Sequence, residues 1–137
     1  MMNTDNGQAL IDAFFDVLRL RDLARCADIL DQLRVVGEQQ PCYAAWAEYL
    51  HGILINERDH DWAAAERIFT ALLETDLPFP LRGRVLIALG RTYHYLGRWP
   101  AAIDAYERSL PVFGELGQVV DQVKAWKEIA ISYRRGF

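Results

Sequence analysis

The sequence predicts an all-α fold built from repeated antiparallel helix pairs. Apolar residues recur three and four positions apart almost throughout the chain, as at Leu86, Leu89 and Tyr93, and this spacing places them on one helix face. Similar segments recur at offsets of about 37 to 40 residues, a period typical of helix–turn–helix repeats. Alternating apolar and polar residues, the pattern of strands, are nearly absent.

Prolines and glycines mark where the expected helices begin and end. Pro41, Pro80 and Pro100 suit the first turn of a helix, where a missing N–H costs nothing. Gly97 follows an apolar helical run and suits a left-handed C-terminal cap. Pro111 should kink its helix or end it near residue 110. The expected helices span residues 5–20, 23–36, 42–57, 61–75, 81–96, 100–114 and 118–135.

The third helix has two possible registers. Aligning Gly52 with Gly90 makes it match the later repeat but buries Glu48 and His51. The alternative needs a longer turn and buries an apolar face consisting of Trp46, Tyr49, Leu50 and Ile53. The sequence does not decide between them.

The internal repeat is clearest at the start of the second helix of each pair. Residues 62–69, beginning Trp-Ala-Ala-Ala, align with residues 99–106, which lie 37 positions later. A weaker copy, residues 23–30, precedes the first of these by 39 positions, and Tyr93 and Tyr133 are 40 apart. Each such unit has an apolar face that only its neighbour can cover.

The best-preserved unit resembles a tetratricopeptide repeat. Its matching residues are Leu89, Gly90, Tyr93, Gly97, Trp99, Ala102, Tyr106 and Leu110. The resemblance extends over nearly the whole chain and implies a right-handed α-solenoid of three units and a final helix, forming a single domain over residues 1–137. The units would span 5–36, 42–75 and 81–114, followed by the helix at 118–135.

The composition excludes several classes of protein. The 137 residues are 52% hydrophobic, yet no apolar run approaches the roughly 18 residues of a membrane span. Residues 1–5 lack the pattern of a signal peptide. Cys26 and Cys42 have neither a zinc-site spacing nor enough partners for a disulfide framework, so we expect a reducing, cytoplasmic location.

No motif of catalysis or cofactor binding is present. The sequence lacks HExxH, a phosphate-cradling glycine loop and G-x-S-x-G. The run Asp59-His60-Asp61 fits a turn in which Asp61 caps the next helix better than it fits a metal site. We therefore expect no enzyme, cofactor or metal. Six aromatic residues fall at repeat spacing and are expected in the core: Trp46, Trp62, Trp99, Trp126, Tyr93 and Tyr106.

The resemblance also implies a binding groove lined by the first helix of each unit. On the fifth helix the groove face would carry Arg84, Ile87, Arg91, His94 and Tyr95. On the last helix it would carry Lys124, Lys127, Ile131, Arg134 and Arg135. Tyr49 and Asn56 would join them in the Gly52 register. Six of the fifteen basic residues would then share one surface of a chain with net charge −4.

The expected function is therefore a protein–protein interaction module or scaffold that binds an acidic peptide or partner protein in this groove. Two alternatives remain open: a structural or homo-oligomerising segment of a larger repeat protein, and a regulator that responds to a ligand or nucleic acid. The net acidity disfavours nucleic acid. The last helix favours self-association or continuation of the repeats, because it has too many apolar residues for one buried stripe: Val119, Val120, Val123, Trp126, Ile129, Ile131, Tyr133 and Phe137.

Overall fold

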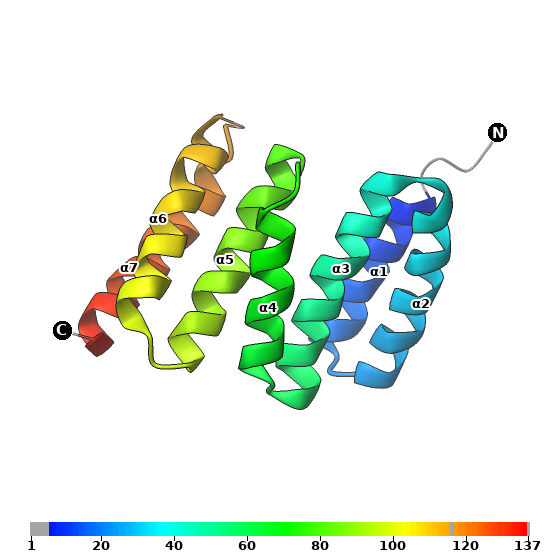
Figure 1. Ribbon diagram of the computed structural model, residues 1–137, viewed down its shortest axis with the longest axis horizontal. Helices are drawn as coiled ribbons and strands as arrows, with labels where there is room; N and C mark the ends of the chain where they lie inside the picture. The colour runs from blue at the N-terminus through cyan, green and yellow to red at the C-terminus, as the bar shows by residue number, and fades with distance from the viewer. Residues whose placement is uncertain (1–5, 116, 137) are drawn as a thin grey trace. The chain divides into compact units, whose positions relative to one another are not determined.

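The computed structural model describes residues 6–115 and 117–136, so the expected helix start at residue 5 and the side chain of Phe137 lie outside the described residues. Within these ranges the chain forms seven α-helices, one π-helical turn and no strand (Figure 1). The fold is therefore the all-α helical repeat that the sequence predicts, while the right-handed sense of the solenoid stays a prediction. The elements are α1 (Asn6–Arg19), α2 (Leu23–Gln39), α3 (Pro41–Leu54), η1 (Ile55–Asp59), α4 (Trp62–Leu73), α5 (Phe79–Tyr95), α6 (Trp99–Glu115) and α7 (Val119–Gly136).

The helices form two compact units, residues 1–60 and 61–137. In the first unit α1 packs on α2 and α2 packs on α3. In the second unit α4 packs on α5, α5 on α6 and α6 on α7. Consecutive helices within a unit run in opposite directions (Figure 1). The expectation of a single domain over residues 1–137 stays a prediction.

The same kind of turn leads into several helices. The residue two positions before the helix has a left-handed backbone at Arg21 (φ 60°), His60 (φ 53°) and Gly97 (φ 76°). The next residue, Asp61, caps α4 by accepting a hydrogen bond from the backbone N–H of Ala64 at 3.1 Å. Asp59-His60-Asp61 is thus the turn that the sequence predicts, and the left-handed cap expected at Gly97 is confirmed.

The helix α6 continues through Pro111 to Glu115, as the expected range 100–114 requires. Of the two effects expected of Pro111, an end near residue 110 is therefore wrong, and a kink stays a prediction. Proline removes one backbone donor from a helix interior and strains the preceding turn. Here the extra turn is held by burial of Val112 and Phe113, whose side chains pack where α5 has Gly83. Burying two large apolar side chains outweighs the local cost of the proline.

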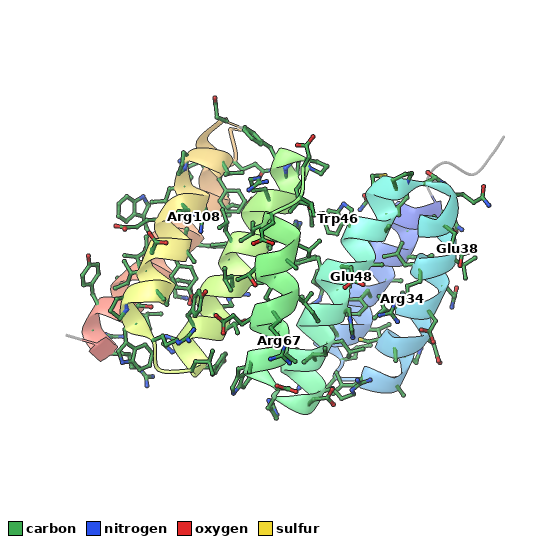
Figure 2. All side chains as sticks on the ribbon, viewed as in Figure 1. Arg34, Glu38, Trp46, Glu48, Arg67 and Arg108 are labelled. Carbon is green, nitrogen blue, oxygen red and sulfur yellow. The ribbon has the colours of Figure 1, made fainter. Side chains whose placement is uncertain are left out.

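The register of α3 lies closer to the second alternative. Glu48 is exposed (Figure 2) and His51 keeps 34% of its side chain exposed, whereas the Gly52 register would bury both. Tyr49 and Leu50 are buried, as the apolar register requires.

This register leaves the other two expected apolar residues, Trp46 and Ile53, half-buried rather than buried. The longer connection that it needs is supplied by η1, a π-helical turn inserted between α3 and the turn at His60. A π-helical turn accommodates additional residues without breaking the helix.

Gly90 lies at the closest approach of α5 to α6. A Cβ atom built on Gly90 would stand 2.6 Å from Cδ1 and 2.8 Å from Cζ of Tyr106, which is fully buried. Tyr106 joins Ala102 and Ile103 of α6 and Ile129 of α7 in one apolar cluster. The sequence-based expectation of a tight helix crossing at Gly90 is confirmed.

Trp126 corrects the expectation that all the repeat-spaced aromatic residues lie in the core. Tyr106 is fully buried, but Trp126 is 58% exposed and its neighbour on the same face, Tyr133, is 49% exposed. The reason is that α6 covers a different face of α7, the one that carries Ala125 and Ile129. The remaining four, Trp46, Trp62, Trp99 and Tyr93, are half-buried.

Candidate peptide-binding face

Three of the expected groove residues follow one face of α5. Arg84 and Arg91 are exposed and stand two helical turns apart, with Ile87 half-buried between them. Ile87 packs against the cluster that contains Tyr106 and Ile129, so this face of α5 borders the region where α6 meets α7.

The expected residues at the end of α5 diverge. His94 is half-buried, with its ring edge-on to that of Trp99 at 4.8 Å between centroids. Trp99 in turn lies against Gly136 at the end of α7, so His94 points toward the α7 side. Tyr95 instead stacks on Trp62 of α4, at 4.5 Å and 11° between ring planes, and remains 62% exposed. Tyr95 therefore contacts α4, whereas His94 contacts α6.

The fifth expected residue of α7, Ile131, is half-buried. The four basic groove residues of this helix are all exposed: Lys124, Lys127, Arg134 and Arg135. Together with Arg84 and Arg91 they are called the basic face below. Among the described residues, no acidic group lies within 4.0 Å of a charged nitrogen of Arg91 or of any of these four. Their charges are therefore not neutralised by ion pairs within the described part of the chain.

The cluster around Tyr106 of α6 includes Ile129 of α7, and Ile87 of α5 packs against it. Burial raises the pKa of Tyr106 well above its usual range, and the negative charge of Glu128 on α7 adds to that rise. The positive charge of Arg91 on α5 acts on the same phenol in the opposite direction. Arg91 of α5 and Glu128 of α7 therefore act with opposite sign on the pKa of the same phenol.

Glu128 is the residue of this region that the sequence-based prediction missed. It is half-buried and stands next to Lys127 in the chain. Its position follows from helical spacing, because it lies three residues before Ile131, but nothing in the sequence indicated its contact with Tyr106.

Tyr49 and Asn56 do not belong to an exposed face. They are 5% and 8% exposed, respectively, and lie in the interior of the first compact unit. The Tyr49 ring packs edge-on to that of Trp46, at 5.7 Å between centroids. Their proposed role depended on the Gly52 register, which exposure of Glu48 argues against.

A shallow pocket of about 290 Å³ lies on another side of the second unit, among α4, α5 and α6. Its wall includes Tyr93, whose ring lies 5.4 Å from the Arg98 guanidinium. Arg98 pairs with Glu66 at 3.0 Å, so its charge is already neutralised. Both signs of charge line the pocket, through Glu74, Asp104 and Arg108, and no sequence pattern predicted it.

Two further properties concern the described residues alone. No group of three or more His, Cys, Asp or Glu side chains is arranged there to hold a metal ion. No helix among them is both long enough and apolar enough to cross a membrane.

Comparison with protein families supports the repeat assignment. The family model described as tetratricopeptide repeat matches residues 43–115, from the start of α3 to the end of α6. Comparison with curated proteins found no match. The family match covers more than half of the 137 residues and coincides with the observed helix pairs, so the chain belongs to the tetratricopeptide-repeat family.

Proposed function

We propose that this protein is an interaction module whose basic face binds an acidic, extended segment of a partner protein. Proteins of the tetratricopeptide-repeat family act in protein–protein interaction or scaffolding, so the general class of function follows from the family. The acidic character of the ligand and its site on α5 and α7 are our proposal.

One observation carries the proposal: exposed cations gather on two helices that flank α6, and most have no ion-pair partner among the described residues. The net charge of −4 already favours solubility, so solubility does not require these cations to lie together on one surface. Arg91 and Arg134 can each hold a carboxylate through two parallel hydrogen bonds, and Lys124 adds a more mobile point charge.

The expected affinity is moderate. Each exposed charge pair contributes about 0.2–1 kcal/mol, so six pairs alone give only a few kcal/mol. Apolar contact must add to them, and the half-buried Ile131 is the nearest apolar side chain on α7. Together these contributions correspond to a dissociation constant in the micromolar range, about −8 kcal/mol. Binding should weaken as salt screens the charges.

Isothermal titration calorimetry with an Asp- and Glu-rich peptide tests the proposal. The peptide should be compared with a neutral version of the same length, in which Asn and Gln replace the acids. The double variant Arg91→Glu/Lys124→Glu should weaken binding of the acidic peptide by about tenfold or more, because two attractive pairs become repulsive.

The matched control is Arg67→Glu/Arg108→Glu, which changes the net charge equally on α4 and α6. Both arginines are exposed and lie on the side of the second unit that faces the viewer in Figure 2. This control should bind almost as the wild type does. Equal weakening in both double variants would mean that only net charge matters and would refute a specific face. Tighter binding of double-stranded DNA than of the acidic peptide would favour the nucleic-acid-responsive alternative instead.

A further inference from the structure

We infer that α7 carries a second binding surface, which docks an amphipathic helix with an acidic edge from a partner protein. The surface is a line of exposed residues along α7, called the α7 apolar stripe below: Val119, Val123, Trp126, Ala130 and Tyr133. It goes beyond the proposed function, because its chemistry is apolar and its ligand is a helix rather than an extended segment.

The spacing within the α7 apolar stripe is that of a helix–helix contact. Its members follow one another at intervals of four, three, four and three residues, which is the pattern of a seam that packs against a second helix. Its large members are exposed: Val119 at 65%, Val123 at 61%, Trp126 at 58% and Tyr133 at 49%. The fold itself uses another face of α7, on which Ile129 packs against α6. A continuous exposed apolar line of this kind marks an interaction site.

In α5, the face that corresponds to the α7 apolar stripe is covered by another helix of the same chain. The residues 40 positions before Val123, Trp126 and Ala130 are Gly83, Leu86 and Gly90. All three are buried, and α6 lies on them, with Phe113 at Gly83 and Tyr106 at Gly90. The corresponding face of α7 is therefore suited to a helix that runs along it as α6 runs along α5.

The side chains of α7 restrict what that helix can present. A Cβ atom on Gly90 would stand 2.6 Å from Cδ1 of the Tyr106 ring, so an aromatic side chain could not pack equally closely on Ala130. Val123 in place of Gly83 likewise leaves no room for a ring such as that of Phe113. The occupant should carry leucine-sized side chains at these points, spaced as the α7 apolar stripe is.

The charged residues beside the α7 apolar stripe indicate which side chains the partner helix should carry along its edge. Lys127 and Arg134 each follow a member of the α7 apolar stripe by one residue, so both lie along the same edge of it. They are exposed and form no ion pair with the described acidic residues. A second copy of this chain, docked antiparallel about a two-fold axis, would bring the same two cations against this edge and be repelled. A partner helix with glutamates there would instead form pairs along its length.

A synthetic helical peptide tests the inference. It carries leucines at the four- and three-residue spacing with glutamates beside them, and its matched versions replace either the glutamates by lysine or the leucines by glutamine. Binding to the full chain is measured by calorimetry. The leucine–glutamate helix should bind about tenfold or more tightly than either version, because both anchors and charges contribute.

Two substitutions on the exposed surface complete the test. Ala130→Arg should weaken binding of the leucine–glutamate helix by about tenfold or more, and Trp126→Gln should weaken it in the same direction. Val35→Glu, at an exposed position of α2, is the control and should leave it unchanged. Circular dichroism should show that all three remain folded.

The outcomes separate this inference from the proposed function. Ala130→Arg should not weaken binding of the extended acidic peptide, because the added cation lies beside the basic face, whereas Arg91→Glu/Lys124→Glu should weaken binding of that peptide more than binding of the helix. The inference is overturned if Ala130→Arg and Val35→Glu bind the helix equally well, or if the lysine version binds as tightly as the glutamate version. A wild-type dimer in sedimentation that Ala130→Arg dissociates would also overturn it, because a second copy would then be the occupant.

Discussion

At the scale of single residues, Gly90 sets how closely α5 and α6 can approach. The Tyr106 ring occupies the space that any Cβ at this position would need, and it is fully buried in a cluster with Ala102 and Ile129. The ring cannot move aside without disturbing that cluster, because protein interiors are close-packed. The small size of Gly90, rather than its backbone freedom, is what the fold requires here.

Gly90→Ala should therefore destabilise the protein by about 1–3 kcal/mol, the usual cost of overpacking. The better helix propensity of alanine, about 1 kcal/mol, offsets only part of this cost. Gly114→Ala in α6 is the matched control, because its Cβ would meet only the end of the flexible Gln122 side chain at 2.9 Å. Urea denaturation of both variants gives the comparison. Equal or greater stability of Gly90→Ala would show that the helices do not cross tightly at this point.

The candidate site was partly predictable at the same scale. Helical spacing correctly grouped Arg84 with Arg91 as exposed neighbours on α5, because spacing alone decides which side chains share a helix face. It could not predict that Tyr95 turns to stack on Trp62, nor decide between the two registers of α3, one of which buries Tyr49. Those outcomes depend on which neighbouring helix covers each face, and periodicity does not contain that information.

At the scale of secondary structure, the helix boundaries were largely predictable. Pro41, Pro80 and Pro100 lie in the first two positions of α3, α5 and α6, as their chemistry requires. The π-helical turn after α3 was not predicted, and the sequence left open whether α6 ends at Pro111 or continues past it, as it does. At Pro111, burial of Val112 and Phe113 overrides the local preference of proline, and the sequence signal reports only that local preference.

Pro111→Ala should stabilise the protein, because α6 already continues through this position and an alanine restores an N–H that can donate within the helix. The expected gain is on the order of 1–3 kcal/mol, below the full interior cost of proline since Pro111 lies near the end of α6. Pro100→Ala is the control at the second residue of the same helix, where the N–H is not needed, and its melting temperature should barely change. A melting temperature of Pro111→Ala at or below the wild-type value would contradict the helical continuation.

At the scale of the whole molecule, the repeat pattern and the compact units divide the chain differently. The boundary between the two compact units falls between residues 60 and 61 of the sequence, but the family match over residues 43–115 runs across that boundary. Repeat proteins are stabilised by contacts between neighbouring units, so a continuous pattern favours joint unfolding. We propose that residues 1–137 form one cooperative domain, as the sequence predicts.

Leu50→Ala tests this cooperativity by hydrogen exchange. Leu50 is fully buried in the first unit, and its truncation should cost about 2–5 kcal/mol. If unfolding is cooperative, the most protected amides of α5 and α6 in the second unit should lose protection by the same amount. Unchanged protection in α5 and α6, together with loss in α3, would show that the two units unfold independently.

We propose that this protein holds an acidic partner on the basic face of α5 and α7. The most direct measurement follows backbone amide chemical shifts of the labelled protein by NMR while the Asp- and Glu-rich peptide is added. The largest shifts should fall in residues 84–94 of α5 and 124–135 of α7, and they should diminish as salt is raised. Shifts concentrated instead around Arg67 and Arg108, on α4 and α6, or no saturable shifts at all, would contradict the claim.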